Sequence, residues 1–337
     1  MAHLVITGGA GFIGSNFVHW LLAREPETEL VVVDDLTYAG NPANLEAVRE
    51  EIRFVKADIA DPGAMRPLLE GADGLINFAA ESHVDRSLES AAPFLHSNAV
   101  GVQALLDLVR DLEVPRFLQV STDEVYGPAP EGVRFDEEAH LNPSSPYAAS
   151  KAAGDLLVNA AVTTWEVPVL ITRACNNYGP FQFPEKLIPL MITNIMEGRE
   201  LPVYGDGMQQ REWMHVREHC AALWAVWEGG RPGRVYNIGT GEEVPNLDLV
   251  RTLVRVMEAD PGLITFVADR PGHDRRYALD VGRLRQEIGW SPSIALEEGL
   301  EETVRWYQEN RDWWEAVKSG AYRDYYQRMY GERGGAD

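Results

Sequence analysis

The chain has 337 residues and a formal net charge of −22 at pH 7. This length suits one large domain or two modest ones. A content of 45% hydrophobic and 24% charged residues is typical of a soluble globular protein. The excess of negative charge argues against nucleic acid or an anionic membrane as a partner. An anionic ligand would therefore need a local cluster of arginine and lysine.

The sequence contains no apolar stretch of the roughly 20 residues that a membrane span requires. Residues 4–6 are apolar but run into glycines without a basic leader, so we expect no signal peptide. Cys175 and Cys220 are the two cysteines, too few for a disulfide framework, which favours a reducing cytoplasm. We expect no metal site, and we expect disorder only in the last few residues, around 334–336.

The first half of the chain alternates short β-rich runs with stretches of helical periodicity. Residues 30–33 form a continuous apolar string, which suits a strand buried on both faces of a parallel sheet. Helical spacing is found in residues 87–112 and 146–165. This alternation predicts a doubly wound α/β domain. The predicted strands are residues 3–7, 30–34, 53–57, 74–80, 116–121 and 167–173.

A glycine-rich turn follows the first predicted strand and opens a helix. Gly9, Gly11 and Gly14 fit G-x-G-x-x-G, and Gly8, Gly11 and Gly14 fit the related G-x-x-G-x-x-G. Glycine is needed where the chain turns tightly and a pyrophosphate approaches bare backbone at a helix N-terminus. The motif predicts a dinucleotide site, although a glycine-rich turn without a ligand is the alternative.

Two acidic positions support a dinucleotide site and favour NAD over NADP. Asp34 ends the second predicted strand, about 20 residues beyond the last glycine, where a carboxylate accepts a ribose diol and repels a 2′-phosphate. Asp58 and Ile59 end the third predicted strand and suit the adenine edge. A solvated strand end is the alternative for each acid.

Tyr147 and Lys151 form a Y-x-x-x-K pair at the start of a predicted helix, a spacing that places both side chains on one face. With Thr122 they make a set that removes a proton from an alcohol while hydride leaves. A free tyrosine has a pKa near 10. We expect the Lys151 ammonium and the nicotinium ring to lower the pKa of Tyr147 by roughly 3 units, or about 4 kcal/mol.

Asp123 and Glu124 follow Thr122 at the carboxyl end of the fifth predicted strand, where such folds bind ligands. A simple alcohol dehydrogenase has no need of two carboxylates there. A reaction that also removes a carbon-bound proton and expels hydroxide needs one base and one acid. A solvated turn is the alternative interpretation of the pair.

After residue 173 the pattern becomes irregular, with frequent proline and glycine. Residues 235–238 read as one more strand, and residues 296–318 as a long helix. The predicted fold is therefore a Rossmann-type doubly wound parallel sheet with a smaller C-terminal α/β domain. We expect the NAD-binding domain to span 1–175 with a return near 216–240, and the substrate domain to comprise 176–215 and 241–330.

With these motifs in view, the chain resembles the extended short-chain dehydrogenase/reductases, and within them the dTDP-glucose 4,6-dehydratases. The resemblance extends over most of the length, and STDEVYG is its most specific stretch, because epimerases of the same superfamily usually lack the Asp-Glu pair. The matching stretches are TGGAGFIGS (7–15), DLTYAGN (35–41), FAAESHVDRS (78–87), STDEVYG (121–127), SPYAASKA (145–152), NNYGPFQFPEKLIP (176–189), YGDGMQQREWMHV (204–216) and DRPGHDRRYALD (269–280).

The resemblance implies roles for five catalytic residues. Tyr147, helped by Lys151 and Thr122, would deprotonate the C4 hydroxyl of the sugar while hydride passes to a tightly bound NAD⁺. Glu124 would remove the C5 proton, and Asp123 would protonate the departing C6 hydroxyl. Hydride would then return to C6, which yields a 4-keto-6-deoxy sugar nucleotide and regenerates NAD⁺.

The resemblance also implies binding residues. Lys186, Arg211 and Arg270 would form the positive cluster that an anionic ligand needs. The expected cofactor contacts are Gly8, Gly11, Phe12, Ile13, Gly14, Asp34, Asp35, Leu36, Thr37, Asp58, Ile59, Phe78, Ala79, Ala80, Ser82, Ser97, Tyr147, Lys151 and Asn177. The expected substrate contacts are Glu81, Ser82, Thr122, Asn176, Lys186, Leu187, Pro202, Tyr204, Arg211, Asn246, Arg270 and His273.

Three alternatives stay open at this point. A nucleotide-sugar 4-epimerase would share the fold, the tyrosine and the lysine but would not need the two acids. A UDP-glucose dehydratase would carry a similar triplet, because no residue here reads thymine without the geometry of a pocket. A dinucleotide-binding regulator should have lost part of the catalytic set, which is complete. A homodimer is expected from the resemblance, through the helices at 87–112 and 146–165.

Overall fold

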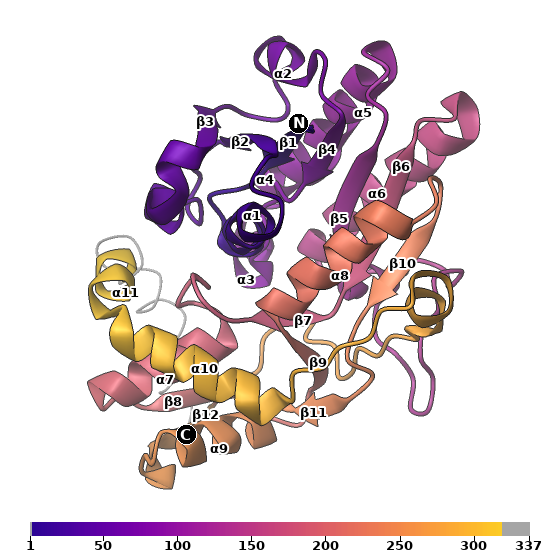
Figure 1. The fold of residues 1–337 in the computed structure, drawn as a ribbon. Coiled ribbons are helices and arrows are strands. Elements are labelled where there is room, and N and C mark those ends of the chain that lie inside the picture. The colour runs from indigo at the N-terminus through magenta and orange to yellow at the C-terminus, as the bar shows by residue number, and fades with distance from the viewer. Residues whose placement is uncertain (1, 319–337) are drawn as a thin grey trace.

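A seven-stranded parallel sheet forms the centre of the computed structural model, which describes residues 2–318 (Figure 1). The strand order is β10-β6-β5-β4-β1-β2-β3, and every neighbouring pair is parallel. The predicted doubly wound fold is confirmed. The strands are β1 (His3–Thr7), β2 (Glu29–Asp34), β3 (Ile52–Lys56), β4 (Gly74–Asn77), β5 (Phe117–Thr122), β6 (Val169–Ala174) and β10 (Val235–Ile238).

Helices cover both faces of this sheet. Alternate strand residues point to opposite faces, so Ile6 joins one hydrophobic cluster and Val5 the other. Helices α1 (Phe12–Arg24) and α8 (Val216–Gly229) pack on the first face. The opposite face is covered by α2 (Pro62–Leu69), α5 (Val102–Asp111) and α6 (Pro146–Trp165). Burial on both sides accounts for the continuous apolar strings of the strands.

The helical spacing at residues 87–112 is confirmed, but the region contains four helical segments and not one continuous helix. They are α3 (Val84–Glu89), α4 (Ala92–Leu95), the π-helical η2 (His96–Gly101) and α5. Ser90 has an extended backbone and ends α3. The Asn98 side chain in η2 bonds to the Glu81 backbone and to Ser150, which ties the distorted turn to neighbouring elements.

A second, smaller core lies below the sheet in Figure 1. Its strands form two small sheets, in the orders β11-β9-β7 and β12-β8. Tyr178, Met191, Leu253, Tyr307 and Trp314 are buried in its centre. The elements are β7 (Asn176–Tyr178), β8 (Leu201–Tyr204), β9 (Gln210–His215), β11 (Glu243–Pro245), β12 (Ile264–Val267), α7 (Leu187–Glu197), α9 (Asn246–Val256), α10 (Leu296–Glu309) and α11 (Arg311–Val317).

The helix predicted for residues 296–318 is two helices, α10 and α11, separated at Asn310. The Asn310 side-chain amide donates to the Trp306 carbonyl at 2.9 Å, which satisfies a carbonyl at the end of α10. The short segments η1 (Pro42–Glu51), η3 (Asp123–Tyr126), η4 (Pro261–Leu263) and η5 (Leu284–Ile288) complete the elements.

The chain returns to the large sheet through α8 and β10, which pairs with β6. The domain boundaries themselves remain a prediction, and residues 319–330 of the second domain lie outside the described residues, as do residues 334–336. Within residues 2–318, no helix combines the length and apolarity needed to cross a membrane. The same residues contain no group of three metal-ligating side chains arranged to hold an ion.

Candidate active site

The glycine turn after β1 forms one wall of a deep cavity. Gly8 has a φ of +68°, and a Cβ there would lie 2.4 Å from the Ala79 nitrogen. A Cβ on Gly14 would lie 2.2 Å from the Gly8 carbonyl oxygen. Gly9 instead packs against Val32 and does not line the cavity. The G-x-x-G-x-x-G pattern is therefore the one that faces this space, and side chains there would close it.

Almost all predicted cofactor contacts line this first cavity, with two exceptions. Leu36 turns away, with a φ of 56° and its N–H bonded to Asp34 at 2.8 Å. The Asn177 amide donates back to the Cys175 carbonyl at 2.9 Å and lies outside the lining. The predicted residues that do line the cavity are Gly8, Gly11, Phe12, Ile13, Gly14, Asp34, Asp35, Thr37, Asp58, Ile59, Phe78, Ala79, Ala80, Ser82, Ser97, Tyr147 and Lys151.

Asp34 stands at the end of β2 with its carboxylate inside the cavity wall. It accepts the backbone N–H groups of Ala10 at 2.9 Å and Leu36 at 2.8 Å. Burial raises its pKa. Because each carboxylate oxygen has two lone pairs, capacity remains for hydroxyl donors. Asp58 lies beyond the end of β3, contrary to the prediction that it ends that strand, and its carboxylate pairs with His96 at 2.7 Å.

Tyr147 and Lys151 project from the first turns of α6, which begins after the Ser145 N-cap. The Lys151 ammonium donates to the Val120 carbonyl at 2.8 Å. Burial lowers the pKa of Lys151 to about 8. The pKa of Tyr147 is raised by burial and by the Glu124 charge, while its hydrogen bond with Thr122 acts in the opposite direction.

The lowered pKa that we expect for Tyr147 from Lys151 and the nicotinium ring is therefore not produced by the protein groups alone. Burial removes the water that would stabilise a phenolate, and the nearby carboxylate of Glu124 opposes a second negative charge. A phenolate here needs a further positive charge beside the ring.

Two carboxylates at the end of β5 have different surroundings. Asp123 is 4% exposed and accepts a hydrogen bond from the Thr122 hydroxyl at 3.2 Å. Burial, followed by the charges of Glu124 and Glu212, raises its pKa to about 8. Burial also raises the pKa of Glu124, but Arg270, Arg211 and Lys186 act against that shift. The surroundings therefore differ: burial and neighbouring acids favour the protonated form of Asp123, whereas three cations favour the ionised form of Glu124.

A second cavity adjoins the first, because Glu185 and Lys186 line both. Glu124 opens into it, whereas Asp123 and Thr122 lie outside the lining of both cavities. Glu81 and Ser82 line the first cavity rather than the second. The predicted substrate contacts in the second cavity are Asn176, Lys186, Leu187, Pro202, Tyr204, Arg211, Asn246, Arg270 and His273.

Three cations in the second cavity are held by different partners. Arg211 donates to the carbonyls of its neighbour Gln210 and of Asp274, both at 2.7 Å, and its guanidinium lies 4.1 Å from the Tyr277 ring centroid. Lys186 donates to the Ser82 carbonyl at 2.9 Å. Arg270 pairs with the Asp85 carboxylate at 2.8 Å. Positive charge is thus concentrated locally in an acidic protein.

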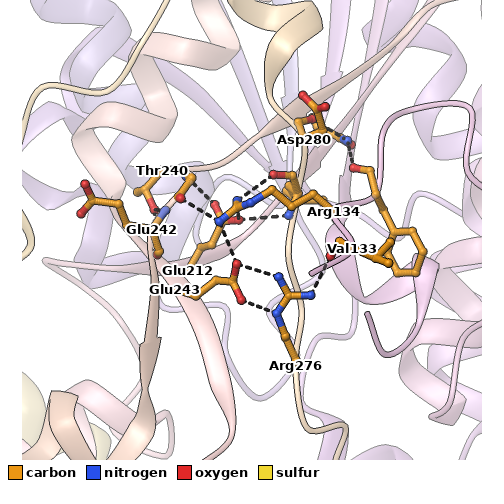
Figure 2. A network of polar contacts seen from close by, with 12 residues as sticks. Val133, Arg134, Glu212, Thr240, Glu242, Glu243, Arg276 and Asp280 are labelled. Carbon is orange, nitrogen blue, oxygen red and sulfur yellow. Dashed lines mark hydrogen bonds and ion pairs between the residues drawn. The ribbon is translucent and has the colours of Figure 1, made fainter. Parts of the chain in front are cut away.

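Behind the second cavity, a polar network fastens four chain segments together (Figure 2). The side chain of Glu212 is 1% exposed and accepts the N–H groups of Leu279 at 3.0 Å and Gly241 at 2.8 Å. Arg134 bridges Glu212 at 3.3 Å and Glu243 at 2.7 Å. The network therefore holds the segment before α6 and the segment after β12 against β9 and β11.

Arg276 closes the same network from the other side. It pairs with Glu243 and donates to the carbonyls of Pro130 and Val133, each at 2.6 Å (Figure 2). Because adjacent strand residues face opposite ways, β9 presents Arg211 to the cavity and Glu212 to the network. The network thus fixes the strand that carries a cavity arginine.

Sequence reasoning gave no role to several residues that line the second cavity. They include His83, Asp85, Glu185, Trp213 and Tyr277. All five lie within the stretches that carry the family resemblance, so their presence there was the available signal. Burial lowers the pKa of His83, and Lys186, Arg86 and Arg270 lower it further.

Comparison with known proteins identifies the relatives of the chain. The family described as GDP-mannose 4,6 dehydratase matches residues 5–303. The chain is 48% identical to a dTDP-glucose 4,6-dehydratase of Streptomyces niveus over 322 residues, covering 94% of this chain and 96% of that protein. The chain belongs to the dTDP-glucose 4,6-dehydratase family.

Solved structures indicate the same family and differ in sequence identity between dehydratases and epimerases. The crystal structure of DesIV, a dTDP-glucose 4,6-dehydratase from Streptomyces venezuelae with NAD and a second ligand bound, matches with a TM-score of 0.91. It shares 49% identity and covers 94% of this chain and 100% of its own. A UDP-glucose 4-epimerase from Thermotoga maritima has a TM-score of 0.86 but only 27% identity, covering 92% and 99%. The epimerases share the fold at lower sequence similarity.

Proposed function

We propose that this chain converts dTDP-glucose to dTDP-4-keto-6-deoxyglucose and water, with NAD⁺ as a tightly bound cofactor. The observation that carries the proposal is the buried acid pair of Asp123 and Glu124 beside Tyr147, with Glu124 facing a cation-lined cavity. Neither acid is needed for epimerisation, which favours a dehydratase. The similarity to dTDP-glucose dehydratases supports dTDP over UDP as the nucleotide.

The first cavity fits NAD⁺. A side chain at Gly8 or Gly14 would collide with backbone, as expected where a pyrophosphate must approach the start of α1. The carboxylate of Asp34 at the far end suits a ribose diol. When bound, NAD⁺ accepts hydride from C4 of the sugar and returns it to C6, so no external redox partner is needed.

Tyr147 removes the proton of the C4 hydroxyl in the first step. Its pKa is raised by burial, so it acts as a base only when a positive charge stands beside it. Lys151 lies on the same face of α6 as Tyr147 and donates to the Val120 carbonyl of β5, and Thr122 hydrogen-bonds the phenol. Both groups orient the tyrosine, and the proton taken from the C4 hydroxyl stays on the Tyr147 oxygen.

Glu124 and Asp123 carry out the elimination. A 4-ketone acidifies the C5 proton, which the Glu124 carboxylate removes under the influence of Arg270, Arg211 and Lys186. Asp123, protonated at neutral pH, donates to the departing C6 hydroxyl. The proton held by Glu124 then returns to C5 as C6 is reduced.

The test is to incubate the purified protein with dTDP-, UDP-, CDP- and GDP-linked hexoses and to measure loss of one water by mass spectrometry. We expect dehydration of dTDP-glucose at the highest kcat/KM. Epimerisation without mass loss, or dehydration of UDP-glucose in preference, would replace the proposal by one of its alternatives. Tyr147→Phe should abolish both the mass change and the absorbance of reduced nicotinamide.

A homodimer in the cytoplasm is the second part of the proposal. Of the large hydrophobic side chains that are exposed among the described residues, five lie on the two helical regions predicted to pair subunits. They are Leu88, Leu95, Val100, Leu156 and Trp165. A second copy of the chain would cover this apolar surface. The two buried, unpaired cysteines are consistent with a reducing compartment.

A further inference from the structure

The short helix α3 places a carboxylate between the two halves of the site. Asp85 is 7% exposed and accepts hydrogen bonds from Arg270 at 2.8 Å and from the Tyr204 hydroxyl at 3.2 Å. Both partners come from the smaller core and line the second cavity. One aspartate from the large domain therefore fixes two cavity residues that are distant in sequence.

The same helix is tied to the catalytic tyrosine. The Ser87 hydroxyl accepts the Tyr147 N–H at 3.2 Å and donates to the Val84 carbonyl at 2.6 Å. Helix α3 thus connects Asp85 to the backbone of Tyr147. The position of Arg270 relative to Tyr147 follows from this connection.

Arg270 has a second acidic neighbour in Glu124. Among the charges that act on Glu124, Arg270 is the strongest in lowering its pKa. Even so, among residues 2–318 no cationic side chain forms an ion pair with the Glu124 carboxylate at 4.0 Å or less. Arg270 and Glu124 both line the second cavity, and charge-assisted pairs of arginine with carboxylate are strong in buried sites.

We propose that Asp85 is a positioning residue that holds the Arg270 guanidinium away from Glu124 and so leaves this carboxylate free to take the C5 proton. The inference rests on the proposed function. Asp85 does not touch the reacting atoms, and its effect passes through Arg270. Loss of its charge releases the guanidinium to Glu124, which blocks the base more than it disturbs the first oxidation step.

The test is Asp85→Asn in the enzyme loaded with NAD⁺ and saturated with dTDP-glucose. Two steps are measured separately: C4 oxidation by the absorbance of reduced nicotinamide, and C5 proton removal by exchange with deuterated water. We expect C5 exchange to fall about tenfold or more, with C4 oxidation changed about twofold at most. The oxidised, undehydrated sugar should accumulate.

A double-variant cycle separates this role from a general structural one. Arg270→Gln alone should slow C5 exchange, because Arg270 lines the second cavity and lowers the pKa of Glu124. If Asp85 acts through Arg270, the double variant Asp85→Asn/Arg270→Gln should exchange C5 no more slowly than Arg270→Gln alone. The double variant removes both charges of the Asp85–Arg270 pair and so leaves no unpaired buried charge. It therefore keeps the role of Asp85 testable if thermal melting shows that Asp85→Asn alone is unstable. Glu297→Gln, which breaks the exposed pair with Arg255, is the matched control and should leave both steps unchanged.

Equal losses in both steps, or a further loss of C5 exchange when Asp85→Asn is added to Arg270→Gln, would overturn the positioning role of Asp85. Absence of dehydration by the unmodified enzyme would instead refute the proposed function. The two failures are therefore distinguishable in one set of reactions.

Discussion

Replacement of Asp123 by asparagine tests the protonation state on which the elimination depends. Burial raises the pKa of Asp123 from 3.8 to about 8, so the folded protein binds this proton more tightly than the unfolded chain does. A neutral carboxyl and an amide have the same shape. Asp123→Asn should therefore fold at mildly acidic pH with nearly unchanged stability.

The magnitude follows from proton linkage. With a raised pKa, the stabilising contribution is complete below the unfolded pKa and is lost as pH rises towards about 8. Between these limits the wild-type free energy of unfolding falls by about 1.4 kcal/mol per pH unit on account of Asp123. The asparagine variant has no such loss, so its advantage over wild type should grow by roughly 3 kcal/mol from about pH 5 to about pH 7.

Urea unfolding of both proteins with saturating NAD⁺ at about pH 5, 6 and 7 measures this difference. Parallel curves for the two proteins would refute a proton held by Asp123. The variant should also oxidise C4 but lose water slowly. The wild-type rate should decline as pH rises through about 8, because Asp123 and Lys151 both lose protons there.

Three further predictions concern separate parts of the molecule. Glu124→Gln should oxidise C4 but stall before C5 exchange, and release of product at the wild-type rate would disprove its role as base. Gly8→Ala should cost at least about 1 kcal/mol and weaken NAD⁺ retention, because the new methyl meets the Ala79 nitrogen at 2.4 Å; calorimetric titration with NAD⁺ measures this. Leu156, 58% exposed on α6, should be needed for the dimer, so Leu156→Glu should give monomers in sedimentation while Phe266→Glu does not.

The sequence predicted the large sheet well because its signals are local. Continuous apolar strings marked the central strands, and the G-x-x-G-x-x-G turn located the cavity wall next to β1. The helices around η2 were harder to predict, because Pro93 and the Asn98 bonds to Glu81 and Ser150 break a pattern that is helical in its spacing. Tertiary hydrogen bonds, which periodicity does not report, decided that region.

Site residues were predictable where a sequence motif includes them. The hydrogen-bond partners that hold these residues in place were not predictable. Arg211 and Arg270 belong to recognisable stretches. Nothing in the spacing, however, indicates that the Asp274 carbonyl holds Arg211 or that the Asp85 carboxylate holds Arg270. The lowered pKa expected for Tyr147 with bound NAD⁺ stays a prediction, and the protein groups alone raise this pKa through burial and the charge of Glu124. Periodicity and motif spacing report neither burial nor partners from distant parts of the chain.

The chemistry of the site depends on β9 as much as on the Tyr-Lys helix. Two adjacent residues of this strand face opposite sides: Arg211 lines the cavity beside Glu124, and Glu212 lies behind it in the network of Figure 2. The charge of Glu212 raises the pKa of Asp123, whereas Arg211 lowers the pKa of both Asp123 and Glu124. For Asp123, burial and the charges of Glu124 and Glu212 each outweigh Arg211. Because elimination needs an acid and a base together, the two faces of β9 matter to the same pair of carboxyls.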